Sequence, residues 1–479
     1  MNLLEVDVAV IGAGTAGLAA YRAARSHQRR VVLIEGGVYG TTCARVGCMP
    51  SKLLIAAADA AHTVAGAARF GVQAGPSQID GKAVMARVRA ERDRFVSFVQ
   101  EGVEKIPAAD RLRGHARFIG RQQLRVDQHT VVHADRVVIA TGSSPLIPAE
   151  FQPAGERALT SDDVFDWSDL PPSVAVIGTG IIGLELGQAL HRLGVRVALF
   201  GRSRIAQLGD PVVQQYASRC LGEELDLRLD AEVLAVQRQA DEVVLVSRGA
   251  DGAPRSERYS AVLCATGRAP NVRDLGLEHA GIELDARGVP LFDPATMRCG
   301  DSTVFIAGDA SHERPLLHEA ADQGRIAGDN AGGYPQIHPG LRREPLAIVF
   351  SDPQIAIAGR GWQQLKKTGG GQFAVGQVSF ENQGRSRVML QNKGVLRVYG
   401  EYGSDRFLGA EMIAPRAEHL AHLLAWAAQS RMTVAQMRDM PYYHPVIEEG
   451  VRTALRDLQE RLMQGLPEIE HCADCTPGM

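Results

Sequence analysis

Two short apolar runs, each followed at once by closely spaced glycines, stand out in the first half of the chain. The runs are Val6–Ile11 and Ser173–Ile177. Near-continuous apolar runs of this length are typical of strands in a parallel sheet that is buried on both faces. An Ala/Leu-rich stretch follows the first run and predicts a helix. The pattern therefore predicts a strand, a tight turn and a helix.

The turn after the first strand has the spacing Gly12-Ala-Gly14-Thr-Ala-Gly17. In such a turn the first glycine permits the sharp bend, the second lets backbone N–H groups approach a pyrophosphate, and the third allows close helix–strand packing. The next predicted strand, over residues 30–34, ends in Glu35, whose carboxylate can accept hydrogen bonds from a ribose 2′-hydroxyl. These features predict a dinucleotide-binding fold.

The same spacing recurs after the second apolar run, at Gly178, Gly180 and Gly183, and a further strand is predicted over residues 195–200. The chain is therefore expected to hold two dinucleotide folds. We expect one of the two dinucleotides to stay bound and the other to bind and dissociate during the reaction. We expect the one that stays bound to be FAD.

The second copy differs from the first at the position of the ribose-binding acid. Gly201 stands there, and Arg202 and Arg204 follow it. An acid repels a 2′-phosphate, whereas guanidinium groups hold one, so the second site is predicted to take NADP(H) rather than NAD(H). The alternative is that these two arginines are solvated loop residues.

Length and composition agree with a multidomain globular protein. At about 100–200 residues per domain, 479 residues predict three or four domains. The net charge of -3 creates no strong field for nucleic acid or anionic lipid, and no long uncharged apolar stretch predicts a membrane span. We expect a soluble, cytoplasmic protein. Its seven cysteines do not indicate a disulfide scaffold.

Cys43 and Cys48 are separated by four residues in GTTCARVGCMPSK, immediately before an Ala/Leu-rich stretch over residues 53–64 that predicts a helix. The spacing differs from a CxxC zinc knuckle, and no second pair accompanies it at metal-binding spacing. A thiolate at a helix N-terminus is stabilised by the helix dipole and unpaired N–H groups, which makes the sulfur reactive. Two inert thiols are the alternative, and no metal is expected.

Taken in order, these motifs resemble the pyridine nucleotide–disulfide oxidoreductases. The resemblance covers residues 6 to about 455. It includes the TCxxxGCxPSK block, both glycine fingerprints, the turns Ala140-Thr141-Gly142 and Ala265-Thr266-Gly267, the Gly308-Asp309 strand end and a late HPxxEE. The dihydrolipoamide dehydrogenase branch is the most similar.

The resemblance implies an α/β fold with two Rossmann-like dinucleotide-binding domains and an α+β C-terminal dimerisation domain. The domains implied are FAD-binding (1–150), NAD(P)-binding (151–270), central (271–345) and interface (346–479). The segment Ser143–Val164 is expected to serve as a linker. A homodimer with active sites shared between subunits is implied.

The family pattern also implies catalytic roles. Cys48 is expected to face the flavin, and Cys43 to exchange with the substrate disulfide. His444 is the expected base and Glu449 its partner, with Glu448 a neighbour. Lys52 and Glu185 resemble an ion pair beside the flavin. Further cofactor contacts are implied for Thr42, Thr141, Gly142, Gly267, Arg268 and Asp309, although Arg268 read alone is equally a structural arginine.

The sequence departs from the family pattern beside the cysteine pair, and Arg202 and Arg204 depart from NAD-using dihydrolipoamide dehydrogenases, which place an acid at the position of Gly201. Thr41 stands where a glycine is common, and Arg45 stands where an asparagine is common. Near the C-terminus, Cys472 and Cys475 form a CxxC beside His471. This tail is interpreted as a redox relay, an incidental tail or a metal-capture site.

Three functions are compared. The leading one is an FAD-dependent, dihydrolipoamide dehydrogenase-like enzyme that moves two electrons between NAD(P)H and a dithiol or disulfide. The second is an NADPH-dependent reductase of another disulfide or of mercuric ion, which the two arginines and the tail favour. A non-enzymatic flavoprotein is the third, and the presence of Cys43, Cys48 and His444 argues against it.

Overall fold

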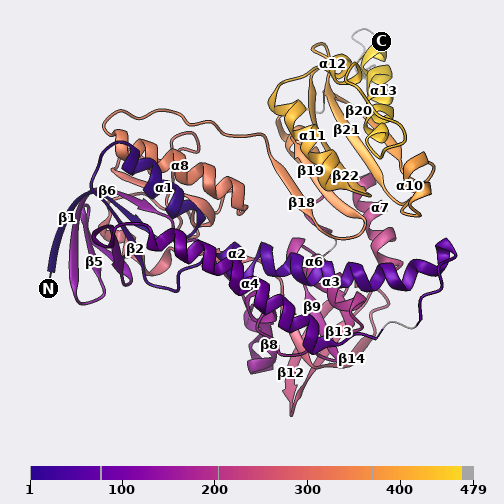
Figure 1. Ribbon diagram of the computed structural model, residues 1–479, viewed down its shortest axis with the longest axis horizontal. Helices are drawn as coiled ribbons and strands as arrows, with labels where there is room; N and C mark the ends of the chain where they lie inside the picture. The colour runs from indigo at the N-terminus through magenta and orange to yellow at the C-terminus, as the bar shows by residue number, and fades with distance from the viewer. Residues whose placement is uncertain (1, 76–77, 203, 369–371, 466–479) are drawn as a thin grey trace, which may run out of the picture. The chain divides into compact units, whose positions relative to one another are not determined.

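The computed structural model describes residues 2–75, 78–202, 204–368 and 372–465. The chain divides into two compact units. Figure 1 labels their helices and strands. The first comprises Met1–Gly178, Ala189–Val197 and Glu232–Arg342, and the second comprises Thr179–Gln188, Ala198–Ala231 and the chain from Arg343 onward. Each unit therefore contains residues of the second dinucleotide fold.

The first unit is built on a seven-stranded sheet. Its order is β3-β2-β1-β6-β5-β4, and β17 also pairs with β6. The strands are β1 (Asn2–Ile11), β2 (Val31–Glu35), β3 (Arg111–Arg113), β4 (Ala116–Gly120), β5 (Gln123–Val126), β6 (Thr130–Ile139) and β17 (Val304–Ile306). Strands β1, β2, β3, β6 and β17 run parallel, while β4, β5 and β6 form an antiparallel meander. The late strand β17 thus completes a sheet that begins at the N-terminus.

Helices cover this sheet and carry the cysteine pair. Apolar side chains of α1 (Thr15–Ser26) and α8 (Leu317–Gly333) share one buried cluster with β1 and β2. The remaining helices of this region are α2 (Thr42–Val46), α3 (Cys48–Gly66) and α4 (Gly81–Glu104). Helix α3 begins at the second cysteine itself, five residues earlier than the Ala/Leu-rich stretch indicates.

Part of the second dinucleotide fold also belongs to the first unit. Strand β15 (Ala261–Cys264) pairs in parallel with β8 (Ala158–Thr160) and β9 (Ser173–Ile177). The two-stranded ribbon of β7 (Ser143–Pro145) and β16 (Arg268–Pro270) joins the entry and exit of this region. The segment Ser143–Val164, expected as a linker, instead contains β7, β8, the 3₁₀ segment Ala149–Arg157 and α5 (Ser161–Val164). An antiparallel sheet follows: β12 (Glu232–Gln239), β13 (Glu242–Arg248) and β14 (Pro254–Tyr259).

The second unit joins the rest of that fold to the C-terminal domain. It contains the start of α6 (Ile181–Arg192), most of β10 (Arg196–Phe200), α7 (Pro211–Gly222) and β11 (Asp226–Arg228). The C-terminal sheet is antiparallel in the order β18-β19-β22-β21-β20. Its strands are Leu346–Val349, Gln354–Gly359, Phe407–Ala414, Val395–Glu401 and Phe373–Ser379.

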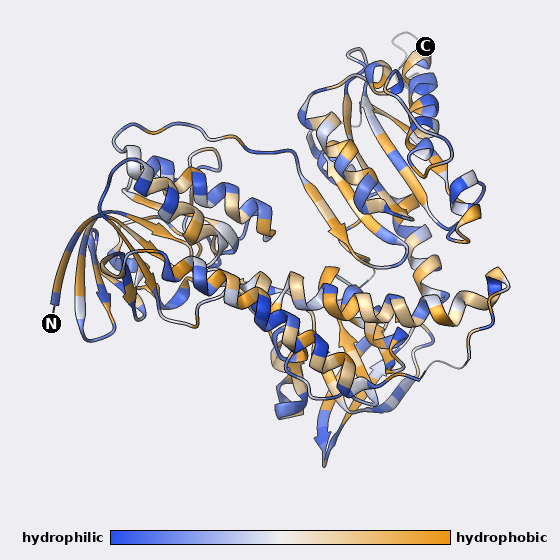
Figure 2. Ribbon diagram, in the orientation of Figure 1, coloured by the Kyte–Doolittle hydropathy of each residue, from blue (hydrophilic) through white to orange (hydrophobic). Residues whose placement is uncertain are grey.

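Helices pack on the C-terminal sheet and close its core. They are α9 (Trp362–Thr368), α10 (Gly384–Val388), α11 (Ala417–Gln429), α12 (Val434–Arg438) and α13 (Glu449–Gln464). Apolar residues of β19, β21, β22, α11 and α13 form one buried cluster, and Figure 2 shows hydrophobic residues concentrated along these strands. Within the described part of the chain, no helix combines the length and apolar character needed to cross a membrane.

Candidate active site

The first glycine fingerprint brings two backbone segments into contact. Gly12 has φ +105°, and a Cβ there would lie 2.3 Å from the carbonyl oxygen of Ala140. A Cβ on Gly17 would lie 1.8 Å from the carbonyl oxygen of Gly12. A side chain at either position is therefore excluded. A Cβ on Gly14, by contrast, would meet no atom within 4 Å, so the start of α1 faces open space of the kind a pyrophosphate needs.

Glu35 lies at the end of β2 and is held by the fingerprint itself. Its carboxylate accepts hydrogen bonds from the backbone N–H groups of Ala13 and Gly37, both at 2.7 Å. A carboxylate has about four acceptor positions, so these two bonds leave room for a ribose hydroxyl. The buried hydroxyl of Thr141 has no hydrogen-bond partner within the described chain. An orphaned hydroxyl beside an open glycine turn fits a dinucleotide such as FAD.

Asp309 belongs to a hydrogen-bonded chain that sequence reasoning missed. The hydroxyl of Ser143 donates to Asp309 at 2.7 Å and accepts from Nε of Arg268 at 2.9 Å. Arg268 also donates to the Ser143 carbonyl at 2.8 Å and to Asp162 at 3.2 Å. Arg268 therefore ties β7, β16 and α5 together. Its expected contact with the coenzyme stays a prediction. Ser143, the serine after the Ala140-Thr141-Gly142 turn, was the one sign of this hydrogen-bonded chain in the sequence.

The two cysteines meet where α2 ends and α3 begins. Cys43 lies on α2, Cys48 is the first residue of α3, and Gly47 joins the helices. Cys43 is partly buried and Cys48 is exposed. Thr41, one of the departures from the family pattern, caps α2 by accepting a hydrogen bond from the N–H of Ala44 at 3.2 Å.

The environment of the pair makes the two thiols unequal. A hydrogen bond with the Cys48 side chain, followed by burial and the charge of Cys48, raises the pKa of Cys43 far above its usual range. The backbone N–H groups of Cys48 and Met49 act in the opposite direction, and their effect is smaller. A negative charge on Cys48 therefore opposes ionisation of Cys43. Cys43 needs a base to become a nucleophile.

Lys52 and Glu185 lie in different units, so their expected ion pair stays a prediction. Lys52 is on α3, one turn after Cys48, and its ammonium is 3.4 Å from the Ser51 hydroxyl. Glu185 is 4% exposed on α6 and accepts a hydrogen bond from the N–H of Phe350 at 3.0 Å.

His444 and Glu449 lie side by side at the start of α13. Nδ1 of His444 is 3.0 and 3.1 Å from the two carboxylate oxygens of Glu449. Because a carboxylate only accepts, Nδ1 carries the proton and Nε2 of this exposed ring is the nitrogen left for substrate. The N–H of Val446 also donates to Glu449 at 3.2 Å.

The hydrogen bond from His444, followed by that from Val446, lowers the pKa of Glu449 below its usual value. Because the pKa of Glu449 is depressed in the folded protein, the stabilisation that this pair contributes is fully present above the unfolded carboxyl pKa of about 4.3. It is lost as the pH falls through the lowered pKa of the folded state.

The second fingerprint repeats the backbone contact of the first. Gly178 has φ +114°, and a Cβ there would lie 2.3 Å from the carbonyl oxygen of Ala265. A Cβ on Gly180 would again meet nothing within 4 Å. Gly183 lies in the first turn of α6. Both turns therefore have the same open face at the start of a helix.

The two fingerprints differ where Glu35 stands in the first. A Cβ on Gly201 would lie 2.4 Å from the Thr179 hydroxyl, so Thr179 fills the space that an acid would need. That hydroxyl donates to the carbonyl oxygen of Arg204 at 2.6 Å. Arg202 and Arg204 are both exposed on the segment that follows β10. Thr179, which the sequence reasoning did not single out, thus excludes the ribose-binding acid.

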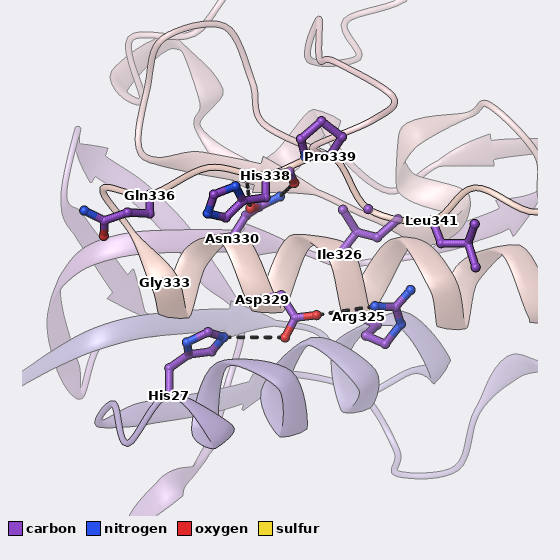
Figure 3. Close-up of a pocket in the computed structure, with 11 residues that line it drawn as sticks. His27, Arg325, Ile326, Asp329, Asn330, Gly333, Gln336, His338, Pro339 and Leu341 are labelled. Carbon is purple, nitrogen blue, oxygen red and sulfur yellow. Dashed lines mark hydrogen bonds and ion pairs between the residues drawn. The ribbon is translucent and has the colours of Figure 1, made fainter.

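Two features remain, one of the structure and one of the sequence. A pocket of about 530 Å³ is lined by His27, which follows α1, by α8 and by the segment after α8, and His27 and Arg325 both pair with Asp329 there (Figure 3). No expected site residue lines this pocket. Cys472 and Cys475 fall outside the described residues, among which no group of three or more His, Cys, Asp or Glu is arranged to hold a metal.

Comparison with known proteins places the chain in a family. A sequence profile of the family described as "Pyridine nucleotide-disulphide oxidoreductase" matches residues 6–324, and the profile of its dimerisation domain matches residues 346–455. The chain belongs to this family. The family is FAD-dependent and works with a pyridine nucleotide, so the predicted family, fold class and oxidoreductase activity are confirmed. The choice between NADP(H) and NAD(H) stays a prediction.

Relatives within the family carry several names. The chain is similar to mercuric reductase from Shigella flexneri, with 32% identity covering 96% of this chain and 82% of the relative. It is similar to dihydrolipoyl dehydrogenase from Thermus scotoductus, with 30% identity covering 95% and 98% of the two chains. The structure of LpdA from Mycobacterium tuberculosis matches with TM-score 0.80 and 26% identity, covering 94% of this chain and 99% of that chain.

The open face at Gly14 leads to a test of FAD binding. Its backbone, at φ -77° and ψ -173°, is accessible to any residue, so Gly14→Ala is expected to leave the thermal midpoint of the apoprotein unchanged. The added methyl group occupies the space of the pyrophosphate and is expected to weaken FAD binding at least about tenfold. FAD titration of the apoprotein measures this effect. Gly66→Ala, at another open position, is the control, and equal FAD affinity in both variants would contradict the assignment.

Proposed function

We propose that this oxidoreductase uses NADPH to reduce a small disulfide through Cys43 and Cys48, as a homodimer. The contact between these two thiols at the start of α3 is the observation that carries the proposal. FAD, when bound, supplies the two-electron step between coenzyme and cysteine pair. The residues proposed to hold it are Gly12, Gly14, Gly17, Glu35, Thr42, Lys52, Thr141, Gly142 and Asp309.

The exchange chemistry follows the roles that the family pattern implies for the two thiols. The Cys43 thiolate attacks one sulfur of the substrate disulfide, the substrate S–S bond breaks, and the released thiolate takes a proton. The Cys48 thiolate then attacks the Cys43 sulfur of the mixed disulfide. A Cys43–Cys48 disulfide forms, and the second substrate thiol leaves.

His444 and Glu449 supply the proton transfers that this exchange needs. Cys43 has a raised pKa and therefore requires a base to lose its proton. Nε2 of His444 serves as that base and returns the proton to the leaving thiolate, while Glu449 keeps the ring oriented and stabilises its charged form. In a homodimer, His444 of one copy would serve the cysteines of the other.

A homodimer is supported by the dimerisation-domain match and by exposed apolar side chains on its α11 helix. Leu423 and Trp426 are 44% and 66% exposed there. Apolar groups of this size on an otherwise packed helix mark a surface for association. A cytoplasmic location stays a prediction of the sequence.

The choice of NADPH rests on the second fingerprint. Thr179 excludes an acid at Gly201, and the exposed Arg202 and Arg204 follow. Arginine pairs well with phosphate oxygens, so this edge suits a 2′-phosphate. Gly267 and Arg268, where β15 passes into β16, are proposed neighbours of the coenzyme.

Two other substrates have specific support. Relatives named mercuric reductase favour reduction of mercuric ion, and relatives named dihydrolipoyl dehydrogenase favour dihydrolipoamide oxidation. Steady-state rates with lipoamide, glutathione disulfide and mercuric ion, each with NADH and NADPH, decide among them. A rate with mercuric ion well above that with every disulfide would replace the proposed substrate.

The order of the two sulfurs can be tested by trapping. Cys48→Ser is expected to accumulate a mixed disulfide on Cys43, because no second thiol is present to resolve it. Cys43→Ser is expected to form none. Intact-mass spectrometry after reaction with an aromatic disulfide reports both species. The opposite pattern would exchange the two roles, and full turnover by either variant would refute the proposed cycle.

The base can be tested by separating the two half-reactions. His444→Ala is expected to slow disulfide exchange by about 10²–10⁴-fold, the range for a positioned acid–base group, while flavin reduction by NADPH keeps its rate. Glu449→Gln is expected to give a smaller loss, and Glu448→Gln is the matched control. Stopped-flow measurement of each half-reaction provides the comparison. Equal slowing of both half-reactions by His444→Ala would make this histidine structural.

Coenzyme choice can be tested in both directions. Arg202→Ala with Arg204→Ala is expected to weaken NADPH binding by about 2–5 kcal/mol and leave NADH unchanged, because only NADPH offers the phosphate. Conversely, Thr179→Ala with Gly201→Glu reproduces the Ala13–Glu35 arrangement of the first fingerprint in the second one and is expected to strengthen NADH binding. Gly201→Glu alone is the control, since Thr179 still occupies the space. Dissociation constants unchanged by all three variants would show that this edge does not select the coenzyme.

A further inference from the structure

The segment 204–210, here called the coenzyme loop, is held tightly to the second fingerprint. Thr179 binds it twice, through its hydroxyl to the carbonyl oxygen of Arg204 at 2.6 Å and through its own carbonyl to the N–H of Ala206 at 2.9 Å. Ala206 and Gln207 both have positive φ, at +49° and +61°. Non-glycine residues adopt this conformation in succession only where surrounding contacts enforce it. The contacts with Thr179 therefore fix the backbone conformation of this loop.

The other end of the loop is held by a buried carboxylate of the dimerisation domain. Glu411, on β22, is 1% exposed. One of its oxygens accepts from the N–H groups of Gly209 and Asp210 at 2.8 and 2.9 Å, and the other accepts from the N–H of Trp362 at 2.7 Å. A single side chain thus joins the end of the coenzyme loop to the start of α9.

Asp210 reinforces the same junction. It is fully buried and accepts hydrogen bonds from Nε of Arg397 at 2.7 Å and from the hydroxyl of Tyr399 at 3.0 Å, both on β21. Its other oxygen caps α7 by accepting from the N–H of Val212 at 2.9 Å. Every hydrogen bond of this junction lies within the second unit.

Gln363, the second residue of α9, reaches from this junction to the exposed arginine. With the amide orientation that satisfies its neighbours, its side-chain oxygen lies 3.1 and 2.8 Å from the two terminal nitrogens of Arg204. A Cβ on Gly209 would lie 2.8 Å from Cγ of Gln363, so the loop and this side chain are in close contact. Glu411 therefore positions both the loop and the residue that holds Arg204.

We propose that Gln363 and Glu411 of the dimerisation domain are positioning residues that set the preference for a 2′-phosphorylated coenzyme. A neutral amide oxygen fixes the guanidinium while leaving its positive charge and up to three of its five N–H donors for the phosphate. A side chain held in advance loses less conformational freedom when ligand binds. This inference rests on the proposed use of NADPH.

The experiment compares Gln363→Ala with Gln364→Ala in the FAD-loaded enzyme. Gln364 is the next residue on α9 and is exposed, which makes it a matched control. Stopped-flow flavin reduction at increasing coenzyme concentration gives a dissociation constant for NADPH and for NADH. Gln363→Ala is expected to raise that of NADPH by about 3–10-fold, the effect of one lost hydrogen bond, with NADH and the thermal midpoint unchanged. Gln364→Ala is expected to change neither.

A double-mutant cycle tests whether Gln363 acts through Arg204. In an Arg204→Ala background, Gln363→Ala is expected to have no further effect on NADPH, because its partner is absent. Additive effects would overturn the proposed route. Glu411→Gln keeps the size of the side chain but loses one acceptor oxygen, and it is expected to weaken NADPH selectively. An unchanged NADPH-to-NADH ratio in a folded Glu411→Gln enzyme would remove Glu411 from the proposal.

The outcomes separate this inference from the function on which it rests. A wild-type enzyme that binds NADH as well as NADPH overturns the proposed coenzyme and this inference together. A wild-type enzyme that prefers NADPH, with Gln363→Ala leaving the preference intact or weakening both coenzymes equally, overturns this inference alone.

Discussion

Both dinucleotide turns depend on one close approach between backbone segments. In each turn the first glycine faces a carbonyl oxygen, of Ala140 in the first and of Ala265 in the second, at a position where a Cβ would be only 2.3 Å away. The contact requires a residue without a side chain and with positive φ. It holds the start of each helix against the neighbouring strand end, with the open glycine position facing outward. The placement of Glu35 and Thr141 in the first site follows from it.

The two dinucleotide folds share this backbone arrangement but differ in the residue at the end of their second strand. In the first turn the small Ala13 leaves space for the Glu35 carboxylate, which its N–H group binds. In the second turn Thr179 fills that space and binds the following segment instead. One side chain on the turn therefore decides whether the next strand can end in an acid. The difference between Ala13 and Thr179 therefore affects the charge beside the proposed coenzyme site.

Reactivity is divided between the two units. The cysteine pair belongs to the first unit, and the His444–Glu449 pair belongs to the second. Cys43 has a raised pKa and is a poor nucleophile by itself. On the proposed function, the thiol becomes reactive only when assembly supplies the base. Glu411 likewise joins the coenzyme loop to the dimerisation domain. On the proposed roles, both half-reactions depend on residues of that domain.

The sequence alone determined the family, the two glycine turns and the order of the motifs, because these depend on short-range spacing and on residue types with few alternatives. Strand β9 has the predicted bounds, and β1 contains the predicted run. Sequence reasoning missed the ribbon that β7 forms with β16, the Ser143–Arg268 link and the Gln363–Glu411 junction. These contacts join residues more than 100 positions apart or place neutral side chains beside charges. Only tertiary packing decides which of these residues meet, because the local sequence pattern carries no information on contacts between distant segments.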